Sequence, residues 1–376
     1  MTTVNASIGY MSPDGVAVDT LRPGGLLRAP TRTVAEDIYQ ALSIHECAVH
    51  DLAASDVPAP SLDIMGFDTV DLSGLTVLQT LLQEIRTANF MTDEQIRQIR
   101  RLLLGKVFRL SNGKTLRILF IAGEGTILRR AGPNGLKINP DEPPTESNGH
   151  DGAQAVHGDQ DVHGTPVRQM LFGAAPFLFN HDSPEGKNRR SPLHLLNLWI
   201  PLQQITRPLV LMDGCTLNRK QHQLRYALPT DSFLDRKEDR RLNDIWTYLH
   251  DPGQQWYFTP ELDSRKAYVF NTLGCPHGAC ILPGEAVVEQ LYIALQTACS
   301  AIRQGNNSAL QSIAVPDLDT LPADCTVPMR KAIEEMAALL TEVKQHVAGD
   351  WQLRATVAMD RVVRKSIEMR LVAWVM

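Results

Sequence analysis

Two short histidine segments constrain the fold of this chain most strongly. The first is His157-Gly158-Asp159, and the second is an extended, Gly- and Pro-containing segment, 270–278, that carries His277. Residues two apart on a strand point to the same side, so His157 and Asp159 can share a site. The third group must then come from a different strand. A jelly-roll barrel brings such strands side by side, and the pattern predicts that His157, Asp159 and His277 form a metal site there.

The central third of the chain has the character of strands. Residues 195–202, 209–212 and 267–270 are short apolar runs bounded by Pro, Gly or polar residues, and 114–129 also looks extended. We expect helices where the apolar spacing is helical. These segments are 33–52, 76–86, 92–104, 235–250, 285–304, 328–348 and 351–375. Residues 1–30 look like an irregular arm, and 139–152 like a loop that leads into His157.

These elements predict a mainly β core with helical flanks, built as a double-stranded β-helix (jelly roll). We expect an N-terminal arm and helical support over 1–110, the jelly-roll core over 111–285, and a C-terminal helical extension over 286–376. The three segments should form one compact unit, because the barrel needs helices to cover its faces.

The order of these motifs resembles the phytanoyl-CoA dioxygenase-like branch of the Fe(II)/2-oxoglutarate-dependent oxygenases. The similar pieces are His157-Gly158-Asp159, the stretch 197–212, and the stretch 270–278; both helical flanks lie outside the resemblance. The resemblance implies Fe(2+) held by His157, Asp159 and His277, with 2-oxoglutarate as co-substrate and dioxygen as oxidant. It also implies hydroxylation, or another oxidation, of a small-molecule substrate. No catalytic residue is expected beyond the metal ligands.

One departure from the family concerns the co-substrate. The family usually places an Arg about ten residues after the distal His, where it pairs with the far carboxylate of 2-oxoglutarate. Here residues 280–301 contain neither Arg nor Lys. A guanidinium is the natural partner of a carboxylate, so the anchor must come from another strand. Arg168 and Arg225 are the predicted cofactor-binding residues.

Several alternatives compete with this interpretation. His150-Asp151-Gly152 would suit a halogenase, in which a small residue makes room for chloride, and Cys275, His277 and Cys280 could form part of a zinc site. A jelly-roll protein that binds a small molecule without a working metal is the main alternative from another class. A cupin-type metalloenzyme that does not use 2-oxoglutarate is the third.

Composition limits the cellular roles. The formal charge is −5 without a basic stripe, which gives no reason to expect a nucleic-acid partner. The six cysteines are scattered, as in cytosolic proteins with reduced thiols. The first thirty residues lack the apolar run of a secretory signal, and no run approaches membrane-spanning length. We therefore expect a cytoplasmic protein with no membrane partner; the sequence does not determine its oligomeric state or its substrate.

Overall fold

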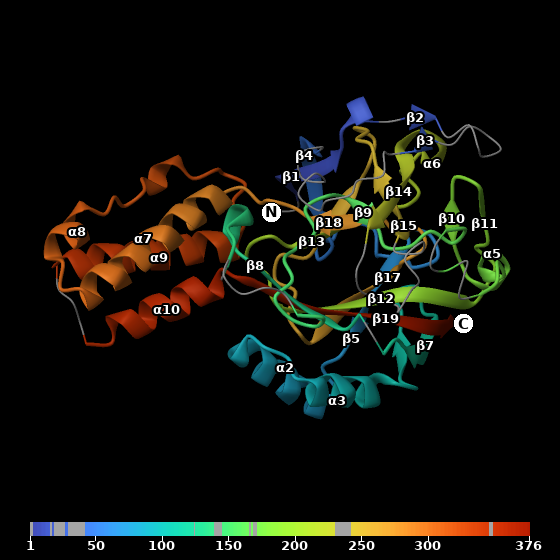
Figure 1. Ribbon diagram of the computed structural model, residues 1–376, viewed down its shortest axis with the longest axis horizontal. Coiled ribbons are helices and arrows are strands. Elements are labelled where there is room, and N and C mark those ends of the chain that lie inside the picture. Colours follow the sequence, from blue (N-terminus) through green and yellow to red (C-terminus); the bar gives the residue numbers. More distant parts are fainter. Residues whose placement is uncertain are drawn as a thin grey trace.

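The protein is described here from a computed structural model (Figure 1). The structure describes residues 3–15, 17–18, 27–28, 42–123, 125–138, 145–164, 167, 171–229, 242–345 and 349–376. Within these residues, no helix has both the length and the apolar character needed to cross a lipid bilayer.

Two β-sheets that face each other form the centre of the molecule (Figure 1). Sheet A has ten strands in the order β1-β4-β16-β13-β18-β9-β15-β14-β3-β2. Its strands are β1 (Thr3–Met11), β2 (Ala17–Val18), β3 (Leu27–Arg28), β4 (Leu42–Asp51), β9 (His157–Gly158), β13 (Leu209–Met212), β14 (Gln223–Pro229), β15 (Leu242–Tyr248), β16 (Trp256–Phe258) and β18 (His277–Ala279).

Sheet B has the order β5-β17-β12-β19-β7-β6, and β8 also pairs with β19. Its strands are β5 (Phe67–Asp71), β6 (Val107–Arg109), β7 (Thr115–Ile121), β8 (Ile127–Ala131), β12 (Leu193–Gln203), β17 (Lys266–Asn271) and β19 (Arg364–Val375). A small hairpin, β10 (Asp182–Ser183) with β11 (Gly186–Lys187), lies outside both sheets. The central pairings of both sheets are antiparallel, and the chain crosses repeatedly between them. The predicted jelly-roll core with helical flanks is therefore confirmed.

Helices α2 (Thr76–Ala88) and α3 (Asp93–Leu103) cover the outer face of sheet B, as Figure 1 shows below β12 and β19. Ile367, Met369 and Leu371 of β19 pack in one apolar cluster with the buried faces of these helices. Helix α3 begins with the predicted capping box, in which Thr92 and Gln95 bond reciprocally. The alternate residues of β19, at even positions from Arg364, consequently face the interior between the sheets.

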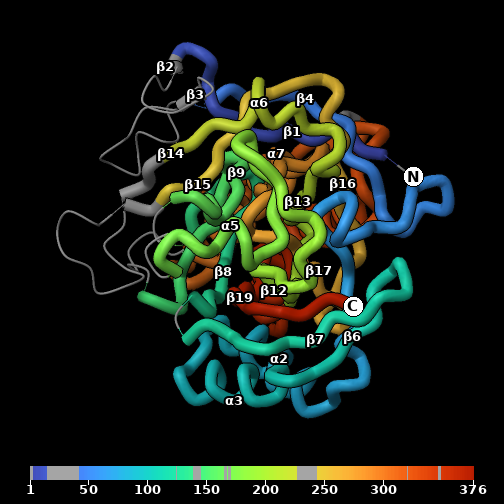
Figure 2. The backbone as a smooth tube through the Cα atoms, turned by 90° about the vertical axis from the view of Figure 1, so that its right-hand side faces the viewer, coloured from blue at the N-terminus to red at the C-terminus, as the bar shows by residue number. Residues whose placement is uncertain are grey.

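A helical bundle follows β18 and lies at one end of the barrel, on the left of Figure 1. It contains α7 (Glu285–Arg303), α8 (Asn307–Ser312), α9 (Val327–Gln345) and α10 (Trp351–Arg361). Glu285 fixes its first turn, because this fully buried carboxylate accepts hydrogen bonds from the backbone N–H groups of Leu282, Arg207 and Asn134. At the opposite end lies the four-residue helix α5 (Ala175–Leu178), and Figure 2 looks onto this end. The remaining short helices are α6 (Arg219–His222), η1 (Pro13–Gly15), η2 (Pro133–Gly135) and η4 (Leu318–Thr320).

Three of the predicted helices are wrong in part. Residues 42–51 form β4, and residues 242–248 form β15. The first parts of these two predicted helices, 33–41 and 235–241, lie outside the described residues. The predicted helix 351–375 ends at Arg361, and 364–375 form β19 instead. The predicted irregular arm contains β1, whose alternate residues Val4, Ala6, Ile8 and Tyr10 are buried. Strands from all three predicted segments, 1–110, 111–285 and 286–376, thus take part in the sheets.

His194 on β12 gives a stability prediction. Its side chain is 1% exposed, and burial lowers its pKa from 6.5 to about 4. Between these pH values the unfolded chain binds a proton that the folded chain does not, so stability falls as the pH drops from 6.5 to 4. We expect His194→Leu to remove about 3 kcal/mol of this loss. Urea unfolding of parent and variant at pH 7, 5 and 4 measures it; parallel pH profiles would contradict it.

Candidate metal centre

The three predicted ligands lie together on the inner face of sheet A. His157 on β9 pairs directly with His277 on β18, so their side chains point to the same face. Asp159 follows β9 immediately, and its Oδ1 atom lies 3.8 Å from the Nε2 atom of each histidine. The ligand atoms of the three residues all lie within 4.8 Å of one another, and this is the one such group found among the described His, Cys, Asp and Glu residues.

Backbone carbonyls orient both imidazoles. Nδ1 of His157 lies 2.9 Å from the carbonyl oxygen of Ala155, and Nδ1 of His277 lies 3.1 Å from that of Cys275. A carbonyl can only accept, so each Nδ1 carries the proton and donates. Each Nε2 therefore presents a lone pair toward Asp159, the tautomer that a metal requires.

The electrostatics keep the site ready for a cation. Burial and the neighbouring His277 lower the pKa of His157 to about 4, so His157 is neutral at physiological pH. Burial opposes ionisation of Asp159, but Arg370, His277 and His157 together hold its pKa well below the usual range. Two neutral imidazoles and one carboxylate are the donor set that non-haem ferrous iron takes, with one face left open.

Sheet B holds the carboxylate of Asp159 from the opposite side. Nδ2 of Asn197 donates to Oδ2 over 3.3 Å, and Nη2 of Arg370 donates to Oδ1 over 3.4 Å. Asn197 on β12 and Arg370 on β19 are directly paired, so they reach across the interior as one unit. Sequence reasoning missed both residues, because their contact with Asp159 depends on the pairing of strands 173 positions apart.

This arrangement gives a prediction about Asn197. Replacing it with Ala frees Oδ2, so that the carboxylate is no longer held toward the histidines, and the affinity for a divalent metal should fall by about 10- to 100-fold. Titration with Co²⁺, followed by its visible absorption, measures the change. Asn89→Ala is the control, because Asn89 is a half-buried Asn at the end of α2, on the outer face of sheet B, and donates to Asp360. Equal Co²⁺ affinity in both variants would contradict the role of Asn197.

The interior on the bundle side of the triad is basic. Arg364 of β19 is 2% exposed and lies over the ring of Trp199, with its Cζ atom 5.5 Å from the ring centroid. Its Nη1 donates to the carbonyl oxygen of Arg207 and its Nη2 lies 3.5 Å from Oγ of Ser366. The Nε atoms of Arg364 and Arg207 and the Nε1 atom of Trp199 are buried without a hydrogen-bond partner. Burial and the nearby Arg129 lower the pKa of Arg364 to about 10.

Of the two predicted co-substrate arginines, the structure describes Arg225 alone. Arg168 lies outside the described residues. Arg225 of β14 is buried, donates to Asp161 and Glu185, and stacks on Trp246 at 4.8 Å. Arg225 pairs with Trp246, and Trp246 pairs with Gly158, so this row faces away from the side that His157 occupies.

The rival metal ligands are not brought together. Nε2 of His150 bonds to the carbonyl oxygen of Thr145. Cys275 and Cys280 are fully buried, and burial raises the pKa of both thiols far above the usual range, which disfavours the thiolates that zinc needs. Within the described part of the chain, neither cysteine joins a metal-binding group.

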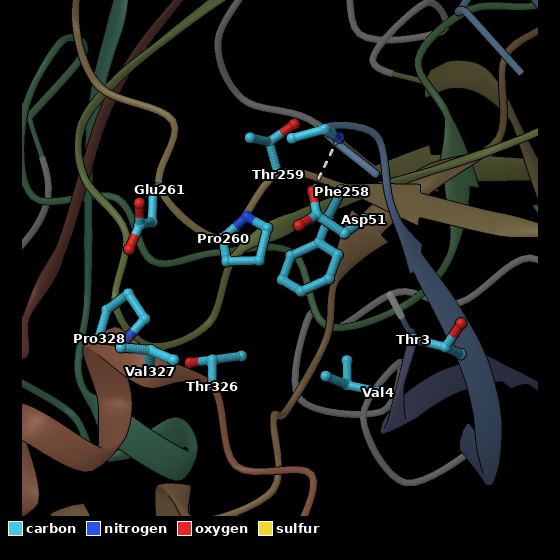
Figure 3. Close-up of a pocket in the computed structure, with 11 residues that line it drawn as sticks. Thr3, Val4, Asp51, Phe258, Thr259, Pro260, Glu261, Thr326, Val327 and Pro328 are labelled. Carbon is cyan, nitrogen blue, oxygen red and sulfur yellow. Dashed lines mark hydrogen bonds between the residues drawn. The ribbon is translucent and has the colours of Figure 1, made fainter. Parts of the chain in front are cut away.

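A separate pocket lies between β1, β16 and the start of α9, and Figure 3 shows its lining. It has a volume of about 180 Å³ and is bordered by Asp51, Glu261 and Pro328 among others. Asp51 accepts a hydrogen bond from the backbone N–H of Ala53, and burial raises its pKa. None of the three predicted metal ligands lines this pocket, so it is not part of the metal centre.

Comparison with known proteins finds similarity of structure only. No family model matches the sequence, and no curated protein matches it. The chain is similar to the solved iron and alpha-ketoglutarate-dependent endoperoxidase NvfI, with 12% identity and a TM-score of 0.46 over 99% of this chain and 98% of that one. A variant of the same enzyme gives 13% identity and a TM-score of 0.48 over 100% and 98%. The functional argument below depends on this chain's own residues.

Proposed function

We propose that the protein is a non-haem Fe(II)- and 2-oxoglutarate-dependent oxygenase that hydroxylates a small molecule. The observation that carries the proposal is the triad of His157, Asp159 and His277, with its Nε2 lone pairs and its ionised carboxylate directed at one point. In the overall reaction 2-oxoglutarate would become succinate and carbon dioxide, one oxygen atom of O2 entering succinate and the other the substrate.

The basic interior fits the co-substrate. A dicarboxylate needs a cation at its far end. Arg364 has a buried, unpartnered Nε atom and forms no ion pair among the described residues, although Glu368 and Asp151 lie near enough to raise its pKa. A Cβ atom added to Gly152 would lie 2.8 Å from Nη1 of Arg364 and 3.5 Å from Cβ of Ala279. Ala279 is two residues beyond His277 on the same side of β18, so the guanidinium lies on the triad's side of the interior.

The position of Arg364 in the chain supports the same role. It follows His277 by 87 positions, and 77 of these belong to the helical bundle 285–361, so ten remain. Ten residues is about the spacing at which the resembled family places its anchor. We therefore propose Arg364, with the hydroxyl of Ser366, as the carboxylate anchor in place of Arg168 or Arg225.

Different residues of the chain would bind the metal, orient its carboxylate ligand and bind the co-substrate. His157, Asp159 and His277 would hold the iron, and Asn197 and Arg370 would orient the carboxylate of Asp159. Arg364 would orient 2-oxoglutarate, and the buried Trp199 would help to exclude water from the same half of the interior. When bound, iron and 2-oxoglutarate supply the chemistry that activates dioxygen and oxidises a C–H bond.

The direct test is 2-oxoglutarate turnover. Protein loaded anaerobically with Fe²⁺ is mixed with 2-oxoglutarate and oxygen, and succinate is measured by mass spectrometry. Slow succinate formation is expected even without substrate, and it should require oxygen and the intact triad. A metal-vestigial binding protein, or a metalloenzyme that does not use 2-oxoglutarate, would give no succinate above the His157→Ala protein.

A second experiment tests the role of the carboxylate. Asp159→Gly removes one ligand and leaves room for chloride, so hydroxylation should be abolished or diverted. Succinate formation with and without 100 mM chloride, together with a search for chlorinated product, measures the outcome. Succinate formation at the parental rate would show that Asp159 is not a ligand.

A further inference from the structure

The interior changes character on either side of the triad. Along β12 and β19, the inward pairs run in the order Trp199 with Glu368, Asn197 with Arg370, Leu195 with Val372, and Leu193 with Trp374. The second pair holds Asp159, so the last two pairs lie beyond the metal centre, away from the helical bundle. The inward rows are therefore charged and polar on the bundle side of the triad, with Arg364, Ser366 and Glu368, and apolar on the other side.

The exposure of these inward side chains rises from the bundle end to the α5 end. On the bundle side Arg364, Ser366 and Trp199 are buried. Beyond the triad Leu193, Leu195 and Val372 are only partly buried, and Trp374 is 39% exposed. The outward residues between them, such as Leu371 and Ala373, are buried, so the exposed side chains are those that face the interior. The inward side chains are therefore less completely covered at the α5 end than at the bundle end.

Apolar side chains from outside β12 and β19 pack against the inward rows at the α5 end. Val162, Val167, Phe179 and Leu273 form a buried cluster, against which Leu193, Leu195 and Val372 pack. The segment around α5 passes over the same end of the barrel, which faces the viewer in Figure 2. It carries Phe172 and Phe177, which are 98% and 85% exposed. Exposed aromatics next to a site of chemistry are typical of a surface that meets an apolar ligand.

The charges nearest this end are already matched. Arg370 donates to Asp159, and beside α5 Asp182 pairs with Arg189 and Glu185 with Arg225. Along the inward rows of β12 and β19 that the structure describes, a substrate that reaches the triad from here therefore meets apolar side chains and no unpaired charge. An anionic thioester or a phosphorylated metabolite would need such a charge.

From this arrangement we infer that the substrate is an uncharged, apolar molecule that enters at the α5 end, where Leu195 and Val372 determine which of its carbon atoms lies next to the metal. The inference rests on the proposed oxygenase function for its chemistry. The binding step does not require metal, and it can be tested alone.

The test uses N-phenyl-1-naphthylamine, an uncharged probe that becomes fluorescent in apolar surroundings, with metal-free protein. The parent should bind it. Val372→Asp and Leu195→Asp should each weaken binding by at least about tenfold, because the bound probe would cover the new carboxylate with apolar groups, which is costly for an ionised group. Both side chains are partly exposed, so the new carboxylates can reach water and the fold should persist; far-UV circular dichroism checks this. Val107→Asp is the matched control, since Val107 is 57% exposed on β6 and lies outside the interior.

A second, anionic probe tests whether the site prefers an uncharged ligand. The anionic 1-anilinonaphthalene-8-sulfonate should bind no more tightly than the uncharged probe, and tenfold tighter binding would overturn the inference of an uncharged substrate. Equal probe affinity in the parent, both interior variants and the control would overturn the proposed entrance. Succinate formation is measured separately. A protein that forms no succinate but binds the probe as expected would contradict the oxygenase proposal and still support the apolar site.

Discussion

Replacing His157, Asp159 or His277 with alanine is expected to weaken ferrous-iron binding by at least about 100-fold, since loss of a direct ligand should cost more than loss of an outer partner. The fold should persist, because the residues around the triad belong to two packed sheets that do not depend on an ion for their core. Anaerobic titration with Fe²⁺ measures the affinity, and thermal unfolding of the metal-free proteins measures the stability.

The control for this experiment is His150→Ala, which removes an imidazole outside the triad that belongs to the halogenase-type alternative. Its iron affinity should equal that of the parent. If all three triad variants bind iron as tightly as His150→Ala does, the assignment of the metal centre is wrong. If His150→Ala is the variant that loses iron, the site lies in the 145–152 loop.

The sequence allowed the core of this arrangement to be predicted. The two-residue spacing of His157 and Asp159 and the extended segment before His277 are local features, and local features survive in any fold that keeps the strands. The structure places these three side chains in one group. The strands 195–202, 209–212 and 267–270 were also predicted, because buried strands are short apolar runs with clear ends.

The helix predicted over 364–375, which is the strand β19, had the largest effect on the prediction of site residues. Residues 366–371 alternate, with Ile367, Met369 and Leu371 on one face and Ser366, Glu368 and Arg370 on the other. That is a strand pattern, but it follows directly on the helix α10 and was interpreted as its continuation. Recognising the alternation would have placed Arg364 and Arg370 in the barrel.

The remaining gap is topological. The 77 residues of 285–361 form the helical bundle and separate β18 from β19 along the chain. A rule that searches about ten residues after His277 therefore cannot reach Arg364, the anchor that we propose. Likewise, β12 and β19 are neighbours with a defined register, and no sequence pattern within either strand reveals that Asn197 pairs with Arg370.

The anchor of the co-substrate gives the other large expected effect. Arg364→Gln should raise the dissociation constant of 2-oxoglutarate by at least about tenfold, because the far carboxylate loses a buried, charge-assisted partner. Metal affinity should stay within about twofold, since Arg364 is not among the groups that contact the triad. Calorimetric titration of the Ni²⁺-loaded protein with 2-oxoglutarate measures the effect without turnover.

Two comparisons make this result specific. 2-Oxopentanoate has the same chain length as 2-oxoglutarate and lacks the far carboxylate, so the parent should prefer 2-oxoglutarate and Arg364→Gln should lose that preference. Arg225→Gln is the matched control, a buried arginine with two carboxylate partners. Breaking that buried cluster should lower the free energy of unfolding by about 3–5 kcal/mol and leave the preference intact. If Arg225→Gln loses the preference and Arg364→Gln keeps it, then the anchor is on β14, and β19 contributes only Arg370 to the site.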